Sequence, residues 1–195
     1  LLVAPALLGK YGLSVLILML YFAYVGQAWN IMMGFAGQLS LGHALYTGLG
    51  AYTAAALFVN LGVNPWVGML AGIFVAAAAA AIIGFLGFRF SIEGVYFALL
   101  TIAFAEFTRI GYNHFDWVKA TAGLFLPVAQ RDFNDVLTLR GRPIMFYYVL
   151  LAMTVLTLVI CHRLLRSKIG QYWLAIREDQ VAAQTLGVDV FRYKL

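Results

Sequence analysis

The order of apolar and charged positions divides this chain into long uncharged stretches separated by short polar segments. From Tyr11 to Phe88 the sequence contains no Asp, Glu, Lys or Arg. A helix needs about 20 apolar residues to cross a hydrocarbon core roughly 30 Å thick, so this run is long enough for about three crossings. A soluble domain could not use it, because no face of such helices would be charged toward water. The pattern predicts an integral membrane protein.

Turn-forming residues divide this uncharged run, and two shorter apolar runs follow it. The first break is the glycine-bracketed sequence at 34–38, and the second is a turn sequence at 60–65. The alanine tract Ala76 to Ala81 suggests a face against which a neighbouring helix packs closely. We expect an all-α fold, a polytopic transmembrane helical bundle, with spans at about residues 11–33, 39–59, 66–88, 94–112 and 143–161.

Composition and charge fit this prediction and leave the orientation open. Charged residues make up 11% of the chain, whereas soluble proteins carry about 25%. The net charge of +5 does not indicate nucleic acid, because the basic residues gather at span ends and in loops. Basic residues lie on both sides of the last span, which favours a cytoplasmic C-terminal side only weakly. They are Arg131, Arg140 and Arg142 before it, and Arg163, Arg166 and Lys168 after it. Five crossings would put Leu1 outside, unless the segment 37–40 is re-entrant.

An amphipathic stretch follows the last span, from Leu174 to Gly187. Its apolar residues at helical spacing are Ala175, Ala182, Ala183 and Leu186. The stretch is too short and too charged to cross a membrane, and Gly187 is well placed to end a helix. Such a helix lies on the membrane surface or docks into a partner, and periodicity alone does not decide between the two.

This stretch carries a resemblance to a known family. Glu178, Ala182, Ala183 and Gly187 resemble the EAA-type loop of ABC importer permeases, in which a coupling helix fits a cleft on the cytoplasmic ATPase. Two further segments, 34–52 and 94–106, are similar to branched-chain amino acid permeases, and closer to the LivM-type than to the LivH-type subunit. The resemblance covers roughly Asn30 to the end, although the segment 119–124 has fewer glycines than the family has there.

The resemblance implies a function and partners. It implies a bacterial inner-membrane permease, incomplete at its C-terminal end, that imports branched-chain amino acids; urea, nucleosides or sugars are alternative substrates of the same scaffold. Its expected partners are a second permease subunit, two cytoplasmic ATPase subunits and an external binding protein. The expected ATPase-coupling residues lie in the cytoplasmic helix 174–187 and are Arg177, Glu178, Asp179, Ala182, Ala183 and Gly187.

The glycine-rich break offers a candidate translocation path. Glycines weaken a helix, and backbone groups freed within a bilayer must be paired or face a wet cavity. The candidate path residues are Gly37, Gln38, Ser40, Gly42 and His43. The alternative is that the glycines only permit close helix crossing and that His43 is a neutral, hydrogen-bonded side chain.

One charged pair lies within a predicted span. Glu106 and Arg109 stand three residues apart, so their side chains can pair on one helix face. We expect a structural ion pair near the membrane boundary rather than a proton relay.

The sequence gives little support to an enzyme. It has no His-Glu-x-x-His, and Ser40 lacks the Gly-x-Ser-x-Gly context because position 38 is glutamine. No phosphate-binding Gly-x-x-x-x-Gly-Lys-Ser/Thr sequence is present, so ATP hydrolysis is expected on a partner chain. We therefore expect no catalytic residue, no metal site and no cofactor. A passive membrane scaffold remains an alternative, but it gives no reason for a coupling-type helix.

Overall fold

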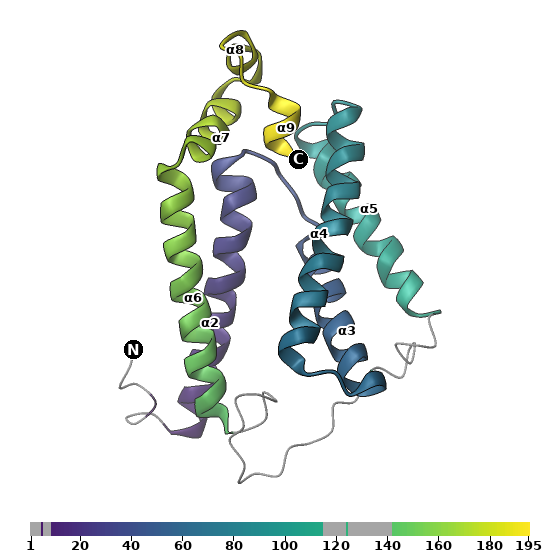
Figure 1. Ribbon diagram of the computed structural model, residues 1–195, viewed down its shortest axis with the longest axis vertical. Coiled ribbons are helices and arrows are strands. Elements are labelled where there is room, and N and C mark those ends of the chain that lie inside the picture. The colour runs from purple at the N-terminus through teal and green to yellow at the C-terminus, as the bar shows by residue number, and fades with distance from the viewer. Residues whose placement is uncertain (1–4, 6–8, 115–123, 125–141) are drawn as a thin grey trace.

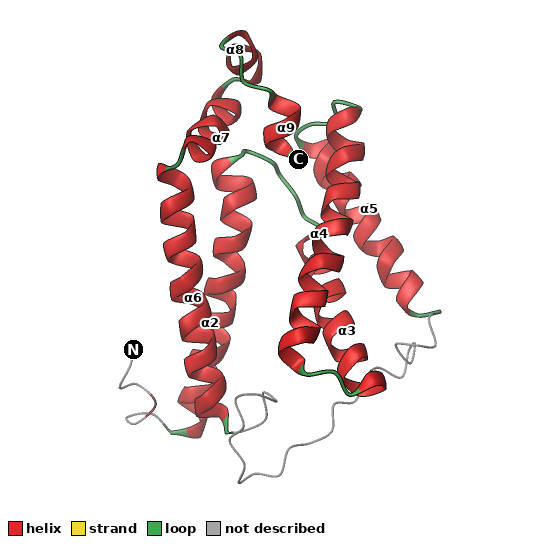
Figure 2. Ribbon diagram, viewed as in Figure 1, coloured by secondary structure: helices red, strands yellow, loops and turns green. Residues whose placement is uncertain are grey.

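The computed structural model describes residues 5, 9–114, 124 and 142–195, and these residues form helices joined by short loops, without a β-strand (Figure 2). The polar segment between the fourth and fifth predicted spans therefore lies almost entirely outside the described residues. This applies to the glycine-poor sequence at 119–123 and to the basic residues Arg131 and Arg140.

Five of the helices are long and apolar enough to cross a membrane, and the chain is a multi-pass membrane protein. They are α2 (Lys10–Asn30), α3 (His43–Leu61), α4 (Pro65–Arg89), α5 (Val95–Tyr112) and α6 (Pro143–Arg166). The π-helical turn η1 (Ile31–Phe35) continues α2 without interruption. The prediction of an all-α polytopic bundle is confirmed, with shifted ends: the second span begins only at His43, and the last helix runs beyond Cys161 to Arg166.

The spanning helices form two groups (Figure 1). In one group α2 packs against α6, and in the other α3 packs against α4 and α5. The first group is held by a small core of Leu13 and Leu20 on α2 with Tyr147 and Leu151 on α6. Tyr147 is completely buried. Most other large apolar side chains of these helices face outward, which suits a lipid environment.

Glycines determine how closely α3 approaches α4. A methyl group placed on Gly72 would lie 2.6 Å from the carbonyl oxygen of Gly50, and one on Gly68 would lie 3.2 Å from Cα of Ala54. The packing face of α4 is therefore this Gly-x-x-x-Gly pattern. The alanine tract is not the face that α4 presents to α3, and none of the alanines 76–81 is buried among the described residues, so its role as a packing face stays a prediction.

Three short helices cover one end of the molecule: α7 (Lys168–Glu178), α8 (Gln180–Thr185) and α9 (Val190–Lys194) (Figure 1). We call residues 168–194 the cap. Its core consists of Ile176, Ala183 and Val190. The cap touches both helix groups, since α7 contacts η1 and α9 contacts α4. It therefore bridges two groups that have few direct contacts of their own.

Candidate translocation and coupling sites

The chain is extended between η1 and α3, and we call residues 36–42 the break (Figure 1). The break begins at the cap end of the molecule and leads into α3, which continues to the opposite end (Figure 1). The break therefore does not return to the end from which it started, as a re-entrant segment would. Gly37 has a φ of +66°, a left-handed conformation that side chains disfavour. The glycine thus permits the chain to leave the helix at this point.

Side chains of neighbouring helices pair the backbone of the break. Trp29 Nε1 donates to the carbonyl oxygen of Ser40 at 3.0 Å, and the Leu41 amide donates to Thr101 Oγ1 at 3.1 Å. Thr101 Oγ1 in turn donates to the carbonyl oxygen of Ala98 at 2.8 Å. Backbone groups inside a bilayer need such partners. Sequence reasoning missed both: Thr101 lies 60 residues from Leu41, and no pattern marks the indole of Trp29, 11 residues before Ser40, as a partner of the break.

Two of the predicted path residues carry buried polar atoms without a partner. Ser40 Oγ and His43 Nδ1 are buried, and neither makes a hydrogen bond to any described residue. Gln38 is also buried, and its Nε2 donates to the carbonyl oxygen of Ala36 at 3.1 Å. Unpaired buried polar atoms are rare in proteins and call for an explanation. They are expected where a polar solute or water occupies the site.

Close packing occurs at the end of the same segment. A methyl group on Gly42 would lie 2.8 Å from the carbonyl oxygen of Thr101, so the break is pressed directly against α5. The predicted path residues therefore show both features that the sequence left open: tight packing at Gly42 and unpaired polar atoms at Ser40 and His43.

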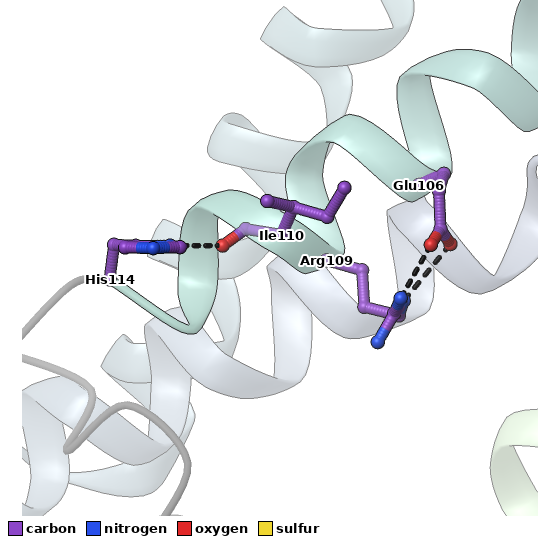
Figure 3. Close-up of polar contacts among 4 residues, drawn as sticks. All are labelled: Glu106, Arg109, Ile110 and His114. Atoms are coloured by element: carbon purple, nitrogen blue, oxygen red, sulfur yellow. Dashed lines mark hydrogen bonds and ion pairs between the residues drawn. The ribbon is translucent and has the colours of Figure 1, made fainter.

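Glu106 and Arg109 form a two-pronged ion pair on the surface of α5 (Figure 3). Arg109 Nε donates to Glu106 Oε2 at 2.9 Å, and Arg109 Nη2 contacts Oε1 at 2.5 Å. Both side chains are more than half exposed, and His114 Nδ1 lies 2.9 Å from the carbonyl oxygen of Ile110 one turn further along. The carboxylate and the guanidinium neutralise each other, which lowers the cost of placing them on an otherwise apolar helix.

The predicted coupling helix is two helices rather than one, and Asp179 separates them. Asp179 is extended (φ −154°, ψ 114°), and its Oδ1 accepts from the amides of Val181 at 2.8 Å and Ala182 at 3.0 Å. It is thus the N-cap of α8, a role for which aspartate is among the preferred residues. The expectation of a continuous helix over 174–187 is wrong because this cap restarts the helix.

The two alanines of α8 lie on different faces of the helix. The apolar face expected from periodicity placed Ala182 and Ala183 together, but Ala183 is buried in the cap core and Ala182 is exposed. Ala182 instead lies beside Val181 and Leu186, which are 70% and 83% exposed. We call these three residues the tip of the cap. Exposed apolar groups gathered at one end of a molecule indicate a contact surface.

Gly187 ends α8 as its position predicted. Its φ is +85°, its amide donates to the carbonyl oxygen of Gln184 at 2.9 Å, and the amide of Val188 donates to that of Ala183 at 3.1 Å. This pair of bonds is the Schellman motif, for which a left-handed glycine is favoured.

Arg177 and Glu178 lie at the junction of α7 and α8. The Arg177 guanidinium contacts the Glu178 carboxylate and also donates from Nη1 to the carbonyl oxygen of Gly34, at 2.7 Å. The side chain of Arg177 lies against Gly37. The structure thus brings a predicted coupling residue into contact with a predicted path residue.

Comparison with known proteins defines the class. Residues 11–195 match the family described as branched-chain amino acid transport system, permease component, and the chain belongs to this family. It is 31% identical, over 98% of its length, to the high-affinity branched-chain amino acid transport system permease protein LivM of Escherichia coli K12. The LivM protein of Salmonella typhimurium LT2 is likewise 31% identical over 98% of the chain. The chain spans 49% of the length of each. No solved structure matches it. The family resemblance drawn from the sequence motifs is confirmed.

Proposed function

We propose that this chain forms part of the membrane path of an ATP-binding-cassette importer for branched-chain amino acids, in the inner membrane of a bacterium. A second permease subunit, two cytoplasmic ATPase subunits and an external binding protein complete the transporter. The chain supplies no catalysis, and ATP hydrolysis belongs to the partner. Its family and the names of its LivM relatives support the substrate class.

The observation that carries the coupling part of the proposal is the tip of the cap. Val181, Ala182 and Leu186 are exposed on a helix that stands beyond the ends of the spanning helices (Figure 1). The cap core and the Schellman motif hold this helix in place. An apolar surface on a rigid support suits a shallow cleft of a soluble partner, because contact there removes apolar area from water.

The distribution of charge favours a cytoplasmic cap only by a small margin. Basic residues at the cap end include Arg89, Arg163, Arg166, Lys168, Arg192 and Lys194. At the opposite end the described basic residues are Lys10, Arg109 and Arg142, and the sequence that joins α5 to α6 adds Lys119, Arg131 and Arg140. Positive residues near span ends favour the cytoplasmic side.

The unpaired polar atoms of the break support a path alongside it. An amino acid carries a charged amino and a charged carboxylate group, which need hydrogen-bonding partners while they cross the membrane. Interrupted helices supply such partners in several transporters. Ser40 Oγ and His43 Nδ1 are buried and unpaired among the described residues, so a polar solute would find hydrogen-bonding partners there once the break opened.

The coupling proposal is tested by placing a charge on the tip. Ala182→Glu in the full-length permease puts a carboxylate between Val181 and Leu186, where the partner would have to desolvate it. The matched control is Gln184→Glu, which adds the same charge to α8 on the side that lines a cavity with α9. We expect Ala182→Glu to reach the membrane but to lose ATPase co-purification and uptake, while Gln184→Glu retains both. Full uptake and ATPase binding by Ala182→Glu would contradict the proposal.

Two further measurements address orientation and substrate. A cysteine at Gln180 should resist impermeant thiol reagents in intact cells and react after the membrane is opened; labelling from outside would reverse the orientation.

Uptake of labelled leucine by the full complex should be inhibited by valine and isoleucine and not by urea or nucleosides. Inhibition by urea or nucleosides alone would assign a different substrate.

A further inference from the structure

One contact joins the cap to the break across a long stretch of sequence. Arg177 Nη1 donates a hydrogen bond of 2.7 Å to the carbonyl oxygen of Gly34, 143 residues earlier in the chain. Gly34 lies in η1, which ends directly before the break, whereas Arg177 is the penultimate residue of α7. The two ends of this bond therefore belong to the two sites described above.

The bond adds to the pairing of a helix end. The last carbonyl groups of a helix have no partner within the helix. Here the amide of Ala36 donates to the carbonyl oxygen of Ile31 at 3.4 Å, and the amide of Gln38 donates to that of Met32 at 3.0 Å. Arg177 takes the carbonyl oxygen of Gly34. A cation at this position also complements the partial negative charge at a helix C-terminus.

The stem of the same side chain lies against the other side of the turn. A methyl group placed on Gly37 would lie 2.7 Å from Cγ and 3.3 Å from Cβ of Arg177. Arg177 thus holds the backbone both before the break, at Gly34, and inside it, at Gly37. A side chain with two such contacts would move this part of the break when α7 moves.

Glu178 fixes the orientation of the guanidinium. Its Oε1 accepts from Arg177 Nε at 3.2 Å and from Nη2 at 2.6 Å, which leaves Nη1 directed to Gly34. Asp179, the next residue, is the N-cap of α8. A continuous set of contacts therefore runs from the tip of the cap through residues 177–179 to the break.

We infer that Arg177 is a positioning residue that transmits the movement of α8 to the break, rather than a residue that contacts the ATPase itself. This inference rests on the proposed function, in which α8 sits on the ATPase. When the ATPase shifts α8, Arg177 shifts the end of η1 and the start of the break with it. The unpaired atoms of Ser40 and His43 lie a few residues further along the break and at the start of α3.

The first test uses the complete importer with its ATPase and binding protein in proteoliposomes. Arg177→Ala removes both contacts, and Arg177→Lys keeps the charge but loses the fork that contacts Glu178 and Gly34 together. The matched control is Arg192→Ala, since the exposed Arg192 side chain makes no hydrogen bond to a described residue. We expect the ATPase to remain bound in all variants. Uptake, and the ratio of stimulated to unstimulated hydrolysis, should fall about tenfold or more in Arg177→Ala, with a smaller fall in Arg177→Lys.

A second measurement follows the break directly, with a readout that a purely structural role would not change. Leu41 is 54% exposed, so a cysteine there, in a background with Cys161 replaced, can report on the break. Its reactivity to a thiol reagent should change when ATP binds to the complex, and this change should disappear in the Arg177→Ala background. A change of equal size in both backgrounds would overturn the inference.

The outcomes separate this inference from the proposed function. Loss of ATPase binding in Arg177→Ala would make Arg177 an ATPase contact and overturn the inference. Loss of both Arg177 variants from the membrane would make the contact a folding requirement and overturn it as well. If Ala182→Glu releases the ATPase while Arg177→Ala transports normally, only the inference fails. If Ala182→Glu leaves both ATPase binding and transport intact, the coupling part of the proposed function fails, and the inference fails with it.

Discussion

Two of the interruptions between described helices, at Asp179 and at the break, are built in different ways. Between α7 and α8 a single residue, Asp179, leaves the helical conformation, and its own carboxylate caps the next helix two and three residues on. Between η1 and α3 the residues 36–42 lie outside any helix, and the partners of this region include residues far along the chain. Thr101 is 60 residues from Leu41, and Arg177 is 143 residues from Gly34.

The comparison shows the difference between an interruption encoded locally and one maintained by tertiary contacts. The Asp179 cap needs nothing beyond residues 179–182, so it would form wherever α8 forms. The break requires α5 and α7 to be in place, since otherwise its backbone groups would lack partners in the bilayer. Movement of α7 or α5 therefore acts on the break and not on the cap of α8.

The largest loss of stability is expected from a substitution of Gly37. Gly37→Ala places a side chain at a φ of +66° and a methyl group 2.7 Å from Cγ of Arg177, so it should destabilise the full-length permease by about 2–5 kcal/mol. Gly62→Ala is the matched control, because Gly62 has a φ of +64° and open space around it. It should cost about 1–2 kcal/mol. Thermal unfolding in detergent measures both.

A double substitution sharpens this prediction. If contact with Arg177 causes the additional cost, the penalty of Gly37→Ala should fall toward that of Gly62→Ala in an Arg177→Ala background. Equal penalties for the two glycines in the wild-type background would show that Arg177 does not hold the break.

Thr101 should have the next largest effect. Thr101→Val keeps the shape but leaves the Leu41 amide without its partner, at a cost of about 1–3 kcal/mol. Thr101→Ser retains the hydroxyl and should be milder. Unfolding midpoints of the two variants make the comparison, and a valine variant as stable as the serine variant would mean that the Leu41 amide finds another partner.

Substitutions at the local interruption between α7 and α8 should reduce stability less than those at the break. Asp179→Ala removes the N-cap of α8 and should cost about 1 kcal/mol, whereas Asp179→Asn or Asp179→Ser should cost less. Because the cap lies outside the spans, we expect proteolysis to detect the change at α8 before global unfolding does. A loss of the membrane fold in Asp179→Ala would show that this interruption also depends on distant contacts.

The smallest effect is expected where α9 touches the α4–α5 loop. The side chain of Lys194 is 4% exposed, and its Nζ lies 3.5 Å from Glu93 Oε1. Burial lowers the pKa of Lys194, and the Glu93 carboxylate opposes part of that shift. The charge on Lys194 therefore lowers the free energy of unfolding at every pH below the lowered pKa of the folded state. This cost decreases as the pH rises from that pKa to the ordinary pKa of a lysine in the unfolded chain.

The lowered pKa of Lys194 predicts how the stability of the Lys194→Met variant depends on pH. At neutral pH the variant should be as stable as the wild type or slightly more stable, because Glu93 stays half exposed and solvated without its partner. Any gain should disappear in strongly alkaline buffer, where the wild-type amine is neutral. Unfolding midpoints across that range test this, and a clear loss of stability at neutral pH would show that the ion pair outweighs the burial cost.

Much of the fold could be predicted from the sequence, because long uncharged runs leave few alternatives. The five spanning helices follow from apolar length, and Pro65 and Pro143 begin two of them at the favoured first position. The close approach of α3 and α4 was also readable, since Gly68 and Gly72 stand four residues apart. The packing face was predicted at the alanine tract instead, because composition alone does not say which face of a helix meets a neighbouring helix.

The candidate sites were predicted less completely. Periodicity predicted one helix with Ala182 and Ala183 on one face, whereas the helix restarts at Asp179 and, within α8, Ala182 is exposed and Ala183 is buried. An aspartate ahead of a short helical run is a readable N-cap signal, so this restart could have been found. The partner of Arg177 could not, because no local pattern identifies a carbonyl group 143 residues away.

The sequence by itself determined that this chain crosses a membrane several times, which family it resembles, and that its helices would be interrupted near Gly37 and end at Gly187. These features depend on apolar length, glycine backbone freedom and short motifs, all of which act within a few residues. Only the tertiary structure decided that Trp29, Thr101 and Arg177 hold the break, and that α8 presents Val181, Ala182 and Leu186 outward. The physical reason is that backbone groups freed inside a bilayer must find partners, and those partners are chosen by which helices pack together.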